Sequence, residues 1–109
     1  MATGAFVRAC KAERDALLAS YADPDGGTAV GQHLRPAGLS DEQRREVFAA
    51  LDLALTDAFY ALLMGLAGAG SLGDTQQHYR LADERGRPIA PNGDADLEAT
   101  AFELFQDED

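Results

Sequence analysis

The chain has 109 residues, enough for one compact domain, and we expect residues 1–109 to form a single domain. Nineteen acidic and nine basic residues give a formal net charge of −10. Nucleic acids and anionic membranes attract proteins through cationic side chains, so this charge argues against both and favours a basic protein partner. The single cysteine, Cys10, excludes an internal disulfide and a cysteine-based zinc cluster.

A first helix is predicted over residues 4–21. Its apolar stripe consists of Phe6, Cys10, Leu17 and Tyr21. Cys10 lies in this stripe, so we expect a buried, inert thiol rather than a catalytic one. The helix should end near Asp23-Pro24, because proline disfavours helical backbone in the residue before it. The first residues lack the apolar core of a signal peptide, which predicts a cytoplasmic protein.

Residues 23–39 contain four glycines and two prolines and are predicted to be a linker. The strongest predicted helix follows over residues 40–68. It begins with a capping box, in which the side chains of Ser40 and Gln43 satisfy free amides of the first turn. Apolar residues then recur at spacings of three or four and predict one core-facing stripe: Phe48, Leu51, Leu55, Phe59, Leu62 and Leu66.

A second, weaker apolar arc on this helix contains Leu53, Tyr60 and Met64, with Asp57 among them. A carboxylate in such an arc must be paired, or must face solvent or a partner. Either Asp57 marks the exposed side of the helix, or it is the acidic centre of a contact patch. Asp57 and Tyr60 are therefore candidate partner-binding residues. The longest apolar run, residues 58–69, is interrupted by glycines and is shorter than the ~20 residues of a membrane span.

Gly68, Gly70 and Gly73 form a literal GxGxxG pattern. In a dinucleotide-binding loop this pattern follows a strand and opens a helix, whose amides hold the pyrophosphate. Here the order is reversed, because a helix runs into the glycines and its carbonyl end repels phosphate. The segment is therefore predicted to be a helix C-cap and turn, and we expect no nucleotide cofactor.

After Gly73 the apolar period changes from 3.6 to 2, which predicts an antiparallel hairpin within residues 75–91. Its turn is "DERG", with Gly86 in the left-handed conformation beside a bulge. A last helix should begin at Asp94 as N-cap. Its inner face contains Leu97, Ala101, Leu104 and Phe105.

The predicted fold class is α+β, with three helices packed on a two-stranded antiparallel hairpin in the order helix, helix, hairpin, helix. Two strands alone are marginally stable, so the hairpin must lie against the second helix or pair with another chain.

No motif in the chain indicates a particular reaction. The two histidines, His33 and His78, lie in different predicted elements. A pocket that combined His78 and Tyr79 with Asp52 or Asp57 would indicate an enzyme, but no spacing demands one. We therefore expect no catalytic residues, no cofactor and no metal.

The end of the chain is strongly acidic, with seven acidic residues and no basic residue from Asp94 to Asp109. Four of these carboxylates, away from the inner face of the last helix, are candidate partner-binding residues: Glu98, Glu103, Asp107 and Glu108. They form a complementary surface for a basic protein, or they act only as a solubilising tail.

The segments "LTDAFYALLMGLAGAGSLGDTQQHYRLADERGRPI" and "LEATAFELF" resemble a family of small, acidic, uncharacterised bacterial proteins. The shared pattern is TDxxYxLLxGLxGxxSLGxxQxxYxLxDExGxxI followed by LExxAxExF, and it covers residues 55–105. Family members often have Asp where Ala67 stands here. The resemblance implies no catalytic residue. In general character, such proteins are also similar to the immunity proteins of bacterial toxin systems.

These features predict a small, acidic, non-catalytic binding protein, such as an immunity or inhibitor protein against a basic bacterial toxin. The alternative is a homodimeric small-molecule-binding or regulatory domain. An enzyme of unknown reaction is the third possibility.

Overall fold

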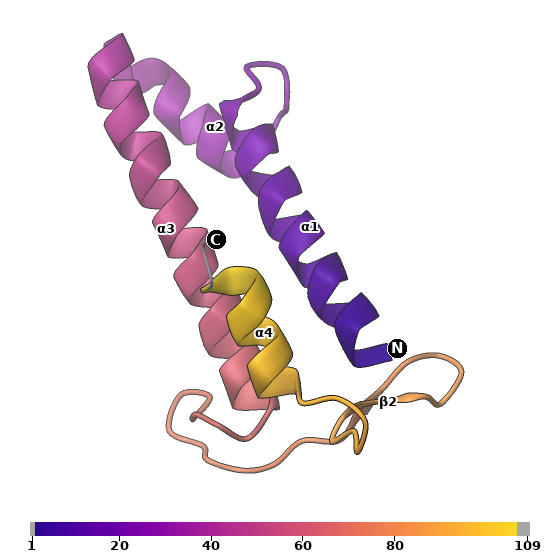
Figure 1. Ribbon diagram of the computed structural model, residues 1–109. Coiled ribbons are helices and arrows are strands. Elements are labelled where there is room, and N and C mark those ends of the chain that lie inside the picture. The colour runs from indigo at the N-terminus through magenta and orange to yellow at the C-terminus, as the bar shows by residue number, and fades with distance from the viewer. Residues whose placement is uncertain (1, 107–109) are drawn as a thin grey trace.

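The computed structural model describes residues 2–106. In that part of the chain, four α-helices and a two-stranded antiparallel hairpin are present (Figure 1). The helices are α1 (Ala2–Ala22), α2 (Ala29–Leu34), α3 (Asp41–Leu66) and α4 (Leu97–Phe105), and the strands are β1 (Leu81–Ala82) and β2 (Pro88–Ala90). The α+β class is confirmed. The predicted order of three helices is wrong, because one further helix precedes the long one.

The additional helix α2 lies inside the predicted linker, and a 3₁₀ turn, η1 (Arg35–Ala37), follows it. The Thr28 hydroxyl caps α2 by accepting a hydrogen bond from the backbone N–H of Gly31 at 3.0 Å. The Arg35 side chain donates to the backbone carbonyl of Pro24 and holds the segment against the end of α1. These two contacts stabilise a short helix in a segment whose glycine and proline content is typical of a linker.

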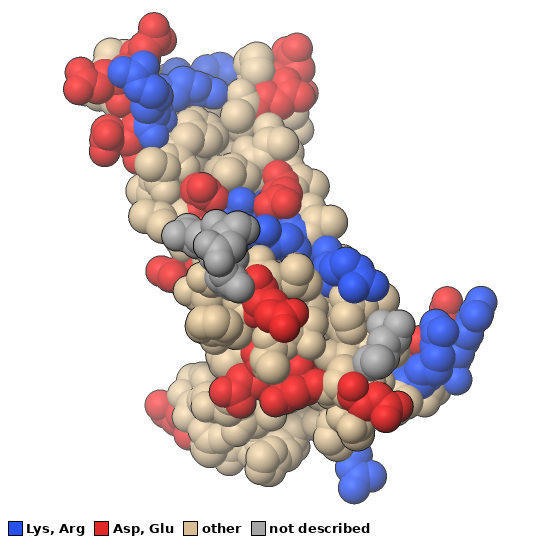
Figure 2. Space-filling model, in the orientation of Figure 1, with Lys and Arg blue, Asp and Glu red and all other residues tan. Residues whose placement is uncertain are grey.

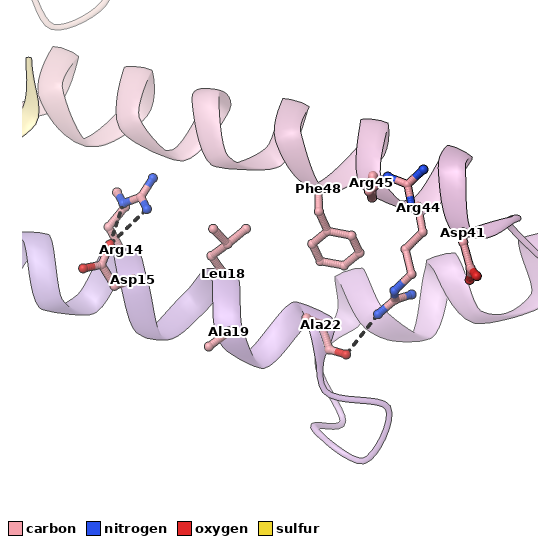
Figure 3. A pocket seen from close by; sticks show the side chains of 9 residues that line it. All are labelled: Arg14, Asp15, Leu18, Ala19, Ala22, Asp41, Arg44, Arg45 and Phe48. Carbon is pink, nitrogen blue, oxygen red and sulfur yellow. Dashed lines mark hydrogen bonds and ion pairs between the residues drawn. The ribbon is translucent and has the colours of Figure 1, made fainter. Parts of the chain in front are cut away.

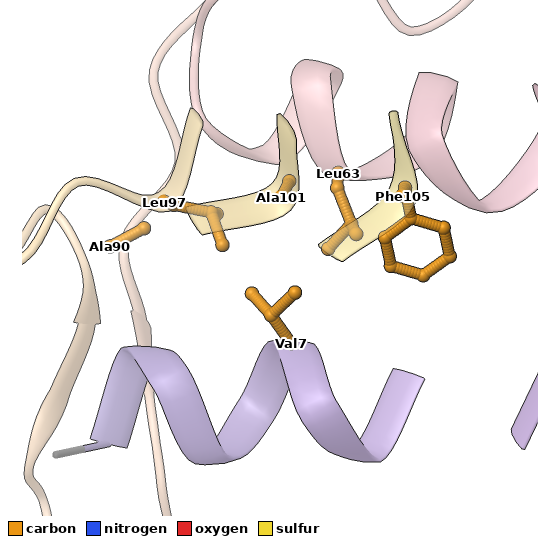
Figure 4. Close-up of a cluster of buried hydrophobic side chains, with 6 residues drawn as sticks. All are labelled: Val7, Leu63, Ala90, Leu97, Ala101 and Phe105. Atoms are coloured by element: carbon orange, nitrogen blue, oxygen red, sulfur yellow. The ribbon is translucent and has the colours of Figure 1, made fainter. Parts of the chain in front are cut away.

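Helices α1 and α3 lie side by side, and α4 lies across one half of the gap between them (Figure 1). The apolar core sits where these three helices and β2 meet (Figure 4). Its buried members are Val7, Leu63, Ala90, Leu97, Ala101 and Phe105. The core therefore occupies one end of the molecule, and the other half of the α1–α3 gap lies outside it.

The α3 helix begins with the predicted capping box, since the Ser40 hydroxyl and the Gln43 side chain each accept a hydrogen bond from the other residue's backbone N–H. The predicted core face of α3 is confirmed at Phe59 and Leu66, which pack against the core cluster, but it is wrong at Leu62. Leu62, expected inside, has 50% of its surface exposed, whereas Leu63 has 1%. The side chains of Asp52 and Thr56 bond to Arg14 of α1, which turns their side of α3, and Leu63 with it, towards the interior.

The hairpin turn is confirmed. The backbone N–H of Gly86 donates to the Asp83 carbonyl at 2.9 Å, and Gly86 has a φ of +81°, a conformation that glycine adopts without a steric penalty. The strand register shifts between Leu81 and Ala82, as expected for a bulge. The strands are shorter than predicted. The hairpin packs on α1 rather than on the long helix, and the buried Thr3 hydroxyl donates to the Ile89 carbonyl at 2.7 Å.

Helix α4 buries the predicted inner face, with Leu97, Ala101 and Phe105 inside. Its N-cap is Asp96, whose carboxylate accepts the Glu98 N–H at 3.0 Å, and not Asp94 as predicted. The Asn92 side chain accepts a hydrogen bond from the Asp94 N–H at 2.9 Å. Residues 92–94 therefore form a local turn, and the helix begins two residues later than predicted.

The molecule is elongated, with extents of 50 × 29 × 29 Å and a radius of gyration of 16.5 Å. A compact domain of 100 residues has a radius of gyration of about 13 Å. Only Leu63 and Gly65 of the 26 residues in α3 are buried. By length and composition alone, α3 is long and apolar enough to cross a membrane, although Asp52 and Asp57 lie within it.

The rotation of α3 predicts unequal costs for two neighbouring truncations. Leu63→Ala should lower the free energy of unfolding by about 3 kcal/mol, because it empties a buried site. Leu62→Ala should lower it by less than about 1 kcal/mol, because half of that side chain already meets solvent. Urea denaturation of both variants measures the difference. Equal losses would contradict this orientation of α3.

Candidate functional site

An open groove with a volume of about 710 Å³ lies between the C-terminal half of α1 and the N-terminal half of α3. Leu18 of α1 and Phe48 of α3 point towards each other across it (Figure 3). Ala19 and Ala22 complete its apolar floor, and its charged rim consists of Arg14, Asp15, Asp41, Arg44 and Arg45. This open groove is the half of the α1–α3 gap that α4 leaves uncovered (Figure 1).

Arg44 and Arg45 lie at one end of the open groove, beside the exposed Asp41 (Figure 3). The Arg44 guanidinium lies 4.7 Å from the centre of the Phe48 ring and donates to the Ala22 carbonyl at 3.0 Å. Arg44 thus ties α3 to the end of α1 and shields one face of the ring. Arg45 is exposed at the same rim and available to an incoming carboxylate.

The other end of the open groove is closed by Arg14, which is buried and which sequence reasoning missed. Its guanidinium donates to the Asp15 carboxylate at 3.0 Å, to the Thr56 hydroxyl at 2.9 Å and to both the carbonyl and the carboxylate of Asp52. The hydrogen bond to Asp52 is the main cause that raises the pKa of Arg14, so the guanidinium stays charged. Every bond lies within the protein, which makes this a structural cross-link between α1 and α3.

Removing this cross-link should destabilise the fold. Arg14→Ala should cost about 2 kcal/mol of unfolding free energy, because it deletes several charge-assisted hydrogen bonds between two helices. Asp52→Asn should cost less than about 1 kcal/mol, because the Asp52 side chain is half-exposed and the bonds to its carbonyl and to Thr56 remain. Urea denaturation compares the two variants, and an unaffected Arg14→Ala variant would show that the cross-link is dispensable.

A second surface lies on the outer side of α4. Phe102 has 53% of its surface exposed, and Glu98 and Glu103 beside it are exposed as well. Glu98 and Phe102 are four residues apart and so share one side of the helix. We call these three residues the α4 face. Figure 2 shows acidic side chains over this part of the molecule, and residues 92–106 contain no Lys or Arg. The candidates Asp107 and Glu108 lie outside the described residues.

The second candidate patch, along α3, is not present as predicted. Tyr60 and Met64 are partly buried and pack against the core cluster. Leu53, with 68% of its surface exposed, and Asp57 remain at the surface. Because Tyr60 turns inward, Asp57 marks the exposed side of the helix and does not sit at the centre of an apolar patch.

His78 lies in a separate hollow of about 270 Å³ with Tyr79, Ala67 and Asp96. Neither Asp52 nor Asp57 lines this hollow, and Asp52 pairs instead with Arg14. The combination that would have indicated an enzyme is therefore not assembled. Within residues 2–106, no three His, Cys, Asp or Glu side chains gather as a metal site needs.

The glycine segment ends α3, as predicted. The Met64 carbonyl accepts hydrogen bonds from the backbone N–H groups of Ala69 and Gly70 at 2.9 and 3.2 Å. Gly68 has a φ of +78° and lies against His78, so close that a Cβ at this position would fall 2.3 Å from the ring. The next element after these glycines is the hairpin and not a helix. The segment lacks the helix amides that a pyrophosphate needs.

Cys10 is half-buried on α1 and packs against the core cluster, where full burial was expected. Burial raises the pKa of its thiol above the ordinary value, because the thiolate would lose solvation. Less reactive thiolate is therefore present at neutral pH than in an exposed cysteine.

Alkylation with iodoacetamide tests this environment. Cys10 should react more slowly in the folded protein than in the urea-unfolded protein, and its pH–rate curve should be displaced to higher pH. Folding that raises a thiol pKa also loses stability as the pH rises from the unfolded pKa through the folded pKa. Identical pH–rate curves in the two states would show that the thiol is not desolvated.

Comparison with protein-family models, curated proteins and solved structures found no match to this chain. The resemblance to small acidic bacterial proteins therefore stays a prediction.

Proposed function

We propose that the chain is a non-catalytic protein-binding module whose α4 face docks on a basic partner protein. The observation that carries the proposal is Phe102, an exposed aromatic side chain between the exposed carboxylates of Glu98 and Glu103. Aromatic residues are enriched in protein interfaces, and polar side chains form the rim around their buried centre.

The charge of the chain supports the same role. A net charge of −10 gives long-range attraction for a basic protein and speeds its approach. The carboxylates of the α4 face form no ion pairs with Lys or Arg among residues 2–106, so they are available for a partner's cations. An inhibitor that blocks a basic protein, such as an immunity protein against a bacterial toxin, fits this surface, and such a protein acts in the cytoplasm.

The first experiment is co-purification of the chain with the product of the neighbouring gene, followed by stopped-flow association at low and high salt. The Glu98→Gln/Glu103→Gln variant should associate about tenfold more slowly at low salt and show a flatter salt dependence. Its melting temperature should stay nearly unchanged, because exposed charges contribute little to stability.

A matched control removes the same charge elsewhere. Glu13 and Glu46 are exposed on α1 and α3 and form no ion pair in the described residues. Glu13→Gln/Glu46→Gln should slow association less than the α4 variant. Phe102→Ser should leave association largely intact and speed dissociation, because it removes the apolar anchor. Equal effects of both charge variants, together with an unaffected Phe102→Ser variant, would refute the α4 face as the docking site.

A further inference from the structure

The chain exposes more surface than a compact protein of the same mass. Its solvent-accessible area is 7316 Å², whereas a compact monomer of the same mass exposes about 5,800 Å². The difference, roughly 1,500 Å², exceeds the ~800 Å² that each partner buries in a standard protein interface. The open groove and the exposed side of α4 are both part of this surface.

The open groove is about as long as α4. Along α1 it extends from Arg14 to Ala22, nine residues, and α4 is also nine residues long. Nine helical residues span about 14 Å. The chain's own α4 already packs between α1 and α3 in the covered half of the same gap (Figure 1). The two long helices thus offer a second position for a helix of this size.

The chemistry of the two surfaces is complementary. The α4 face presents Phe102 between Glu98 and Glu103, and the open groove presents an apolar floor with the exposed Arg45 at its rim. In a contact between them, the aromatic ring would meet Leu18 and Phe48, and the carboxylates would meet Arg45, on a rim that also holds Asp15 and Asp41. Both surfaces belong to one chain, so two copies can satisfy each other.

We propose that the α4 face of a second copy of this chain docks in the open groove, and the reverse contact forms at the same time. One twofold axis relates the two contacts, so the assembly is a closed homodimer in which each copy gives one α4 face and one groove. The dimer does not require a basic partner, but it covers the α4 face. A basic partner that uses the same face must displace the second copy, so partner binding and dimer formation compete.

Sedimentation equilibrium of the purified chain over a range of concentrations tests the dimer without any partner. The wild type should show a dimer. Glu98→Arg/Glu103→Arg and Arg45→Glu should each raise the dimer dissociation constant at least about tenfold. Arg44 is left intact because it binds the Ala22 carbonyl within its own copy. Circular dichroism should show that each variant remains helical.

Mixing the two variants gives the decisive result. In the mixed dimer, one contact has the wild-type residues on both sides, and the other has swapped charges on both sides. The mixture should therefore regain a dimer with an affinity within about tenfold of the wild type. Phe102→Ala should weaken the dimer as well. The control variant Leu53→Ser, on a different side of α3, should leave it unchanged.

Several outcomes would overturn the proposal. A monomer at every concentration excludes the dimer. A dimer that is lost with Leu53→Ser or Leu62→Ser, but kept with the α4 and Arg45 variants, would be formed by α3 instead. Monomeric protein that co-sediments with phosphatidylcholine vesicles would show that lipid covers the apolar surface. Arg45→Glu leaves the α4 face intact, so its binding to a basic partner tests the proposed function independently.

Discussion

The position of α4 between α1 and α3 is the contact on which the rest of the structure depends. Leu97, Ala101 and Phe105 bring one side of α4 against Val7 of α1 and Leu63 of α3. The ring of Phe105 stacks on Phe59 with centroids 6.4 Å apart. Because buried apolar surface is the main driving force of folding, this cluster provides most of the cohesion between the three helices.

A nine-residue helix covers only part of a pair of helices that are 21 and 26 residues long. Beyond it, polar groups replace the apolar core. Arg14 bonds to Asp52 and Thr56, and farther on Arg44 reaches the Ala22 carbonyl. These directional bonds fix the distance and rotation of the helices without filling the space between them. The open groove follows directly from this arrangement.

Features set by neighbouring residues were predictable from the sequence. The capping box at Ser40 and the turn at Gly86 each depend on contacts within four residues. The outward position of Glu98 and Glu103 also follows from the helical period once the inner face is known. Features set by distant residues were not predictable. Arg14 has no local signal, because its partner Asp52 is 38 residues away.

The exposure of Leu62 on α3 shows the same limit. Its apolar residues form a broad stripe, and both Leu62 and Leu63 are compatible with a core position in a helical wheel. The choice between them depends on where α1 and α4 pack, which the wheel does not contain. Helix α2 was missed for a different reason, since its glycine and proline content is typical of a linker and its stability depends on Thr28 and Arg35.

The start of α1 and the segment around the end of β2 meet in one layer of the structure. The Thr3 hydroxyl, at the start of α1, donates to the carbonyl of Ile89 and accepts from the side chain of Asn92 at 2.9 Å. During synthesis the N-terminal part of a chain emerges first. Helix α1 can therefore gain these two hydrogen bonds only after residues 89–92 have been synthesised, whereas its contacts with α3 can form earlier. The layer that joins the start of α1 to the hairpin therefore forms later during synthesis than the contact between α1 and α3.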